Sequence, residues 1–76
     1  MNIHNMLSSV PGVPSSESVN QKARVLAGLL QGEGYDITEH GVRKWFARKA
    51  IPADWLGRVT TMARKSAPKF DPFNYA

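Results

Sequence analysis

The sequence predicts an all-α fold of four short helices followed by an extended tail that is rich in aromatic residues. Apolar residues recur at the three- and four-residue spacing of helices. Segments with this spacing are separated by proline or glycine breaks, at residues 11–14, at Gly32 and at Pro52. A chain of 76 residues is expected to form one domain, near the size at which a single core is only just sufficient. We therefore expect a domain over residues 1–66 and a C-terminal tail over residues 67–76.

The first two helices are expected over residues 3–10 and from Val19 to about Gln31. Both contain apolar residues at helical spacing, and the first ends at the proline and glycine break. Ser18 precedes the second helix and has the hydroxyl that suits an N-cap. Gly32 follows this helix and is a natural C-terminal stop.

The third helix is expected over residues 37–50. Val42, Trp45 and Phe46 lie three and four residues apart, so they share one side of a helix and can face the core. Asp36, directly before the helix, is the expected N-cap. The remaining positions are mostly polar and cationic, so the opposite side of this helix is expected to face outward.

The fourth helix is expected over residues 52–66. Pro52 suits the first position of a helix, because it lacks a backbone N–H and its φ is preset. Asp54 then lies in the first turn, where a negative charge interacts favourably with the helix dipole.

The tail contains two prolines and three aromatic residues, so it is not expected to form a long helix. Phe70, Phe73 and Tyr75 would expose a large apolar area if this segment were extended in water. Two arrangements remove that area from water: the tail folds back onto the core of its own chain, or it packs on a second subunit. In the second arrangement these three aromatics are the candidate dimer contacts.

The composition is that of an ordinary folded chain, with 42% hydrophobic and 21% charged residues. The absence of cysteine excludes disulfides and thiolate metal sites and favours the cytoplasm. We expect neither a membrane span nor a signal peptide, because no apolar run approaches about 18 residues and no charged leader precedes an apolar segment.

Catalytic chemistry is not indicated by the sequence. The only histidines, His4 and His40, are far apart, and no serine lies in a motif with a paired base. We therefore expect no enzyme, no metal, no cofactor and no small-molecule ligand.

Positive charge is concentrated in the second half of the chain. The net charge is +4, and residues 37–69 hold eight lysine or arginine residues against only Glu39 and Asp54. Such a field attracts polyphosphates and makes their binding strongly dependent on salt. The alternative is that these cations only solvate two amphipathic helices.

The third helix and its C-terminal boundary carry a family resemblance. The segment reads Val42-Arg-Lys-Trp45, then Arg48, then Ile51-Pro52. Over residues 19–66 the chain resembles the small Cro-like and YdaS-like helix-turn-helix proteins of phages and prophages. The resemblance implies a four-helix helix-turn-helix domain whose third helix is the recognition helix for DNA. From Gln31 to Asp36, however, the chain has about five residues more than the tight turn usual in the motif, which bears on the angle between the two helices.

The side of the third helix away from the core supplies the candidate DNA contacts. Arg43 and Lys44 lead, because arginine can bond guanine O6 and N7 together and lysine neutralises a phosphate. Arg48 lies at the far end of the helix and is expected to hold the DNA backbone. The resemblance also implies a phosphate contact at Lys22, for which a solvated surface lysine is the alternative.

The first turn of this helix supplies three more candidates. Thr38, Glu39 and His40 lie at the end that normally reaches base edges. Glu39 could instead be only a cap, and His40 only a solvated side chain. Trp45 and Trp55 are expected to be core anchors rather than platforms for single-stranded bases, because both occupy apolar helix positions.

These features predict a sequence-specific protein for double-stranded DNA, a phage-type transcriptional regulator that occupies an operator as a homodimer. The alternative from a different class is a protein-interaction adaptor, antitoxin-like or polymerase-binding, that uses the same basic surface against an acidic partner. RNA binding is a third alternative. DNA reading predicts a strong salt dependence and preference for one palindromic duplex, whereas an adaptor would copurify with a protein and ignore duplex sequence.

Overall fold

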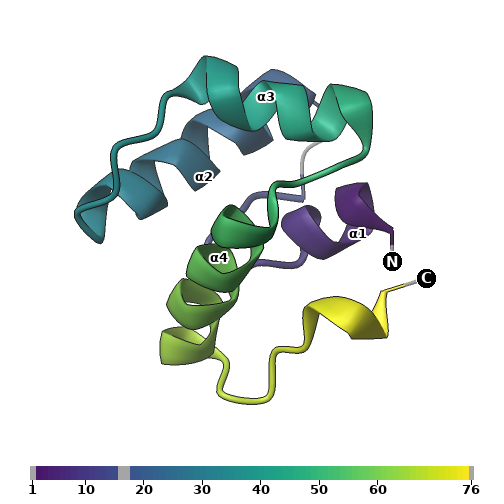
Figure 1. Ribbon diagram of the computed structural model, residues 1–76, viewed down its shortest axis with the longest axis vertical. Coiled ribbons are helices and arrows are strands. Elements are labelled where there is room, and N and C mark those ends of the chain that lie inside the picture. The colour runs from purple at the N-terminus through teal and green to yellow at the C-terminus, as the bar shows by residue number, and fades with distance from the viewer. Residues whose placement is uncertain (1, 16–17, 76) are drawn as a thin grey trace.

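The computed structural model describes residues 2–15 and 18–75, and the regular structure in this part of the chain is entirely helical. The prediction of an all-α fold is confirmed. In chain order the elements are α1 (Ile3–Ser8), α2 (Val19–Gly32), α3 (Glu39–Arg48), α4 (Ala53–Ser66) and the short 3₁₀ turn η1 (Pro72–Asn74). Figure 1 shows α2 and α3 together on one side of the molecule, with α1 and α4 beneath them. No helix in the described ranges is long and apolar enough to span a bilayer.

Two of the long helices begin at hydroxyl side chains that cap free backbone N–H groups. Ser18 Oγ accepts a hydrogen bond from the N–H of Gln21 (3.3 Å) at the start of α2, as the sequence predicts. At the start of α3, Thr38 Oγ1 accepts from the N–H of Gly41 (3.1 Å). The prediction of Asp36 as the cap of α3 is therefore wrong, and the helix begins later than expected.

A contact from α2 explains the later start of α3. Gln31 Nε2 donates a hydrogen bond to the backbone carbonyl of Ile37 (2.7 Å). If α3 began earlier, this carbonyl would accept from the N–H of Gly41. Because that N–H is bonded to Thr38 instead, the helix does not extend back to Ile37.

At its other end, α3 stops at a left-handed residue. Lys49 has φ 53° and ψ 38°, and the N–H of Ala50 bonds to the carbonyl of Trp45 (3.2 Å). Helices commonly end this way, but glycine or asparagine usually occupies the left-handed position because a Cβ is strained there. The predicted helix over residues 37–50 is thus too long at both ends.

Replacing Lys49 by glycine is expected to raise the free energy of unfolding by about 1 kcal/mol, because glycine adopts a positive φ without the steric cost of a Cβ. Urea denaturation followed by circular dichroism measures the change. Lys49→Ala removes the same charge but keeps the Cβ, so it should bring no comparable gain. An equal gain in both variants would assign the effect to charge rather than to the backbone.

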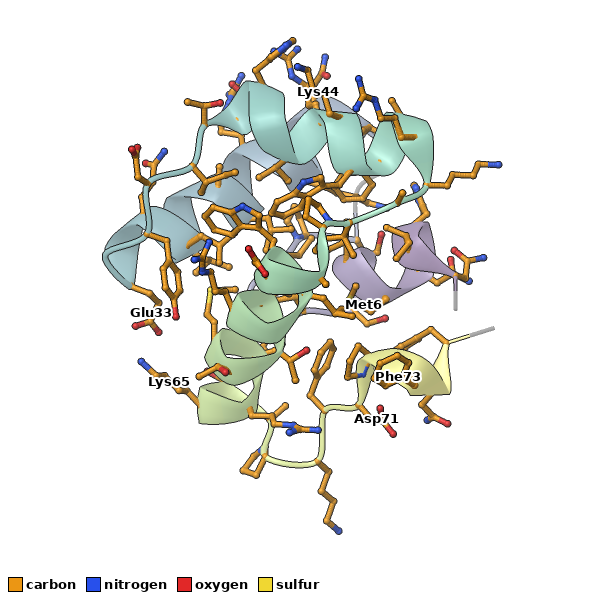
Figure 2. All side chains as sticks on the ribbon, in the orientation of Figure 1. Met6, Glu33, Lys44, Lys65, Asp71 and Phe73 are labelled. Carbon is orange, nitrogen blue, oxygen red and sulfur yellow. The ribbon has the colours of Figure 1, made fainter. Side chains whose placement is uncertain are left out.

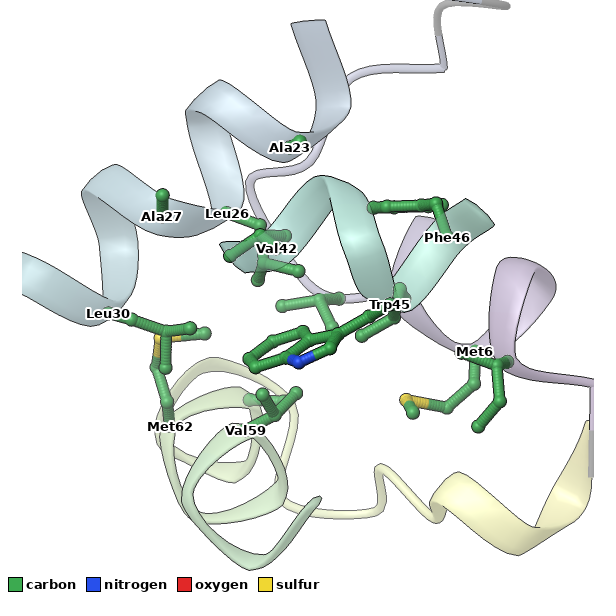
Figure 3. Packing of buried hydrophobic residues seen from close by; sticks show 14 of the residues in the cluster. Met6, Ala23, Leu26, Ala27, Leu30, Val42, Trp45, Phe46, Val59 and Met62 are labelled. Carbon is green, nitrogen blue, oxygen red and sulfur yellow. The ribbon is translucent and has the colours of Figure 1, made fainter. Parts of the chain in front are cut away.

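The hydrophobic core draws on all four helices (Figure 3). The largest fully buried side chains are those of Met6, Leu7, Leu26, Leu30, Val42 and Val59. Trp45 of α3 is only 6% exposed, and its ring centroid lies 5.6 Å from that of Trp55 on α4. Figure 3 shows the Trp45 ring projecting from α3 toward Val59 of α4. This packing fixes which side of α3 is turned inward.

The tail folds back onto the core of its own chain. Phe70 is buried, and its carbonyl accepts a hydrogen bond from Arg64 Nε (2.8 Å). The N–H of Asn2 donates to the carbonyl of Tyr75 (2.6 Å), so the first and last described residues lie side by side (Figure 1). Phe70 thus belongs to the chain's own core, in the first of the two arrangements expected for the tail, and Tyr75 is half-buried with its ring centroid 6.0 Å from that of Phe70. Phe73 is 72% exposed and stays accessible to a partner.

Candidate nucleic-acid interface

One side of α3 is packed into the core and the other is open. Val42, Trp45 and Phe46 are buried, as their spacing predicts. On the opposite side lie residues that are exposed or half-buried, and we call this set the outer face: His40, Arg43, Lys44, Ala47 and Arg48. Figure 2 shows Lys44 pointing away from the rest of the molecule.

The cations of the outer face make no ion pair with any described residue. Arg43 is half-buried, and its Nε is buried without a hydrogen-bond partner in the described chain. Buried polar groups are nearly always bonded, so such an atom calls for an explanation. A ligand does not reach this Nε, because the protein covers it, but the same guanidinium carries two Nη groups that can donate to acceptors of a ligand. Lys44 and Arg48 are exposed and add two positive charges beside it.

The other predicted contacts lie in the first turn of α3, and of these only His40 belongs to the outer face. Thr38 uses an oxygen lone pair for the helix cap, and its hydroxyl hydrogen is still available to a ligand. His40 is exposed. Glu39 Oε1 lies 3.4 Å from Nε of Arg24 on α2, so a cation partly compensates its negative charge.

Arg24 of α2 is a further candidate contact, which the sequence does not distinguish. Its side chain is 76% exposed, and it stands beside the first turn of α3 through its pair with Glu39. Several polar residues on the outside of α2 have equivalent helical positions in the sequence. Only the packing of α2 against α3 decides which of them reaches α3.

Lys22 does not share this exposure, because it is enclosed between α1 and α2. It is 8% exposed, and its Nζ lies 3.1 Å from Ser8 Oγ and 3.5 Å from His4 Nε2. Lysine side chains normally carry the ammonium out to water. Here polar groups of α1 hold it inside the fold, so the surface position that a phosphate contact requires is not present, and we omit Lys22 from the candidate interface.

The cations of α4 are engaged within the chain. The guanidinium carbon of Arg58 lies 4.6 Å from the ring centroid of Trp55, in cation–π contact. Lys65 Nζ lies 2.7 Å from Glu33 Oε2, and this hydrogen bond, together with the negative charge of Glu33, raises the pKa of Lys65 above its usual value. The positive charge predicted for the second half of the chain therefore has two environments. The cations of α3 make no ion pair with a described residue, whereas those of α4 contact an aromatic ring, a carboxylate or a backbone carbonyl.

Two hollows lie along α3, and both have mainly apolar walls with cations at their edges. The larger, of about 460 Å³, is lined by Gly41, Lys44, Trp45, Arg48, Ala50, Ile51 and Pro52. The smaller is shallow, measures about 200 Å³, and is lined by His40, Arg43, Lys44 and Ala47. The smaller hollow therefore lies within the outer face, and the larger lies between α3 and the linker to α4.

Comparison of the chain with models of protein families, with curated proteins and with solved structures finds no match. Across residues 2–15 and 18–75, no three side chains of metal-ligating type come together. The outer face of α3, with its unpaired cations, is therefore the candidate functional site in this part of the chain.

Proposed function

We propose that the protein binds double-stranded DNA sequence-specifically through the outer face of α3, as a phage-type transcriptional regulator at an operator in the cytoplasm. One observation carries the proposal: a helix anchored on its inner side by Trp45 carries unpaired cations on its open side. The major groove of B-DNA is wide enough to admit an α-helix. Packing of α2 against α3 supports the helix from behind, as the helix-turn-helix motif requires.

Each contact has a proposed role. Arg43 reads a base edge, because its side chain is partly immobilised and its donors suit guanine O6 and N7. Lys44 and Arg48 are exposed and neutralise phosphates. Thr38 and His40 approach the bases at the N-terminal end of α3. Glu39 holds Arg24 near the DNA backbone through their ion pair.

We further propose that the protein occupies its operator as a homodimer. A single recognition helix covers only about half of an operator, whereas a two-fold dimer places two helices roughly 34 Å apart, one turn of the duplex. Phe73 on η1 is the exposed aromatic side chain of the tail (Figure 2) and supports a dimer contact there.

Selection of bound sites from a random duplex library tests the proposal. The expected product is one preferred sequence, arranged as an inverted repeat with half-sites separated by one helical turn. Failure to enrich any sequence would refute sequence-specific DNA binding. Enrichment of a single half-site without a repeat would retain DNA binding and refute the dimer.

Salt dependence gives an independent measure of the phosphate contacts. The logarithm of the association constant should fall linearly with the logarithm of the salt concentration, with a slope of about −0.9 for each neutralised phosphate. Arg48→Ala should therefore make the slope less steep by about 1 per protomer. Arg58→Ala is the matched control, because Arg58 already lies over an aromatic ring, and it should leave the slope unchanged.

A protein-interaction adaptor is the second candidate function, and the larger hollow favours it. A hollow of about 460 Å³ between Trp45 and Pro52, bordered by Lys44 and Arg48, suits an apolar side chain of an acidic protein segment. The same selection experiment separates the two functions, because an adaptor would enrich no duplex and would copurify with a protein partner.

A further inference from the structure

The smaller hollow on α3 lies at the centre of the surface proposed to meet DNA. Its lining residues, His40, Arg43, Lys44 and Ala47, follow i, i+3, i+4 and i+7 spacing, so they form a single stripe along the helix. Because this stripe is opposite the buried side of α3, the hollow opens outward. The hollow is shallow and measures about 200 Å³, so it can receive a small chemical group.

The chemistry of the hollow is apolar at its base and cationic at its edges. Ala47 is exposed and contributes only a methyl group, whereas the three residues around it have long side chains. Arg43 and Lys44 also line the hollow, and each adds a positive charge. Arg43 is partly immobilised, since its Nε is covered by the protein. A ligand that fits this site presents an apolar group beside electronegative ones.

We infer that this hollow receives the C5-methyl group of a thymine, so that Ala47 determines part of the sequence specificity. The inference rests on the proposed function. Thymine is the base that carries a methyl group at the major-groove edge, and alanine is one of the side chains that contact it. The acceptors of a neighbouring guanine, or the phosphates, then meet Arg43 and Lys44. The preferred half-site therefore contains a thymine adjacent to the base pair that Arg43 reads.

A phosphate is a poorer occupant of the same hollow. Phosphate oxygens require hydrogen-bond donors on several sides, whereas the position of Ala47 supplies none. Lys44 and Arg48 are exposed, so their charged ends can contact phosphates of the DNA backbone that lie outside the hollow. The apolar base thus distinguishes a methyl site from a general anion site.

Replacing thymine by deoxyuridine tests the inference, because uracil pairs in the same way and lacks only the methyl group. Each thymine of the selected duplex is replaced in turn, and the dissociation constant is measured by fluorescence anisotropy. One thymine per half-site should show about a fourfold loss of affinity, the effect expected for one buried methyl group. The other thymines should show no loss.

Variants of the protein assign this effect to the hollow. Ala47→Ser places a hydroxyl at its base, so this variant should bind the thymine and uracil duplexes with equal affinity. Ala53→Ser is the matched control, because Ala53 is an exposed alanine in the first turn of α4 and lines neither hollow. It should keep the fourfold preference. Equal thermal melting of the two variants and the parent would show that the fold is retained.

The outcomes separate this inference from the function on which it rests. If the protein selects a duplex but tolerates uracil at every position, the methyl site is refuted and DNA binding stands. If uracil weakens binding equally in the parent and in Ala47→Ser, the methyl group is read elsewhere and the assignment to Ala47 is wrong. If no duplex is preferred, the proposed function fails and the inference fails with it.

Discussion

Replacing Trp45 by alanine is expected to lower the free energy of unfolding by about 3–5 kcal/mol. The side chain is almost completely buried, and its ring packs against Trp55, so it joins α3 to α4. Truncation leaves a cavity at this junction and removes the contacts that orient the outer face. A loss of this size is comparable with the roughly 3–5 kcal/mol that a single hydrophobic core supplies in a domain of this size. Thermal and urea unfolding, followed by circular dichroism, measures it.

Phe73→Ala is the matched control, since it truncates an aromatic side chain that is mostly exposed. Its effect on the unfolding of the monomer should remain within about 0.5 kcal/mol. A Trp45→Ala variant that melts like the parent would contradict the packing in Figure 3 and would favour Trp45 as a stacking platform for nucleic-acid bases.

The four helices were predictable because local signals agree with the tertiary structure. Apolar spacing, Ser18 as a cap and the break before Pro52 all specify helices in the same places as the packed core. Errors remain at the helix ends. The first helix ends at Ser8 rather than at residue 10, Gly32 is the last residue of α2, and Pro52 is the N-cap of α4 rather than its first residue. At the start of α3, a side-chain contact six residues away in the sequence decides. Nothing near Asp36 in the sequence indicates that Gln31 binds the carbonyl of Ile37 and delays the start of the helix.

The arrangement of the tail was not predictable for a similar reason. Its aromatic residues require burial, but the sequence does not specify the surface that buries them. The choice between the chain's own core and a second subunit depends on contacts such as those of Arg64 with Phe70 and of Asn2 with Tyr75. The residues of the second pair stand at opposite ends of the chain, so no local pattern relates them.

The candidate interface was predictable in outline but not in detail. The helical repeat of 3.6 residues places Val42 and Trp45 on the buried side of α3, and the same repeat determines which residues form the outer face. The burial of Lys22 depends instead on the packing of α1, and the role of Arg24 depends on the packing of α2 against α3. The hollow at Ala47 depends on side-chain positions, which periodicity does not specify.

Replacing Arg43 by alanine is expected to weaken binding to the preferred duplex by about 1–3 kcal/mol and to flatten sequence preference. The variant loses the bidentate contact to guanine at one base pair, and with it the preference for guanine over other bases at that position. Arg48→Ala should weaken preferred and random duplexes more evenly, because a phosphate contact carries no base information. Titrations of the selected duplex and of a scrambled duplex at one salt concentration measure both effects.

Arg43→Lys separates the geometry of this contact from its charge. Lysine keeps the positive charge but cannot form the two parallel hydrogen bonds of a guanidinium. If Arg43 reads a base, the lysine variant should lose sequence preference almost as fully as the alanine variant while retaining more affinity for scrambled DNA. If Arg43→Lys behaves like the parent on both duplexes, or if Arg43→Ala loses affinity equally on both, Arg43 contacts the backbone alone. Base reading would then fall to Thr38 and His40 in the first turn of α3.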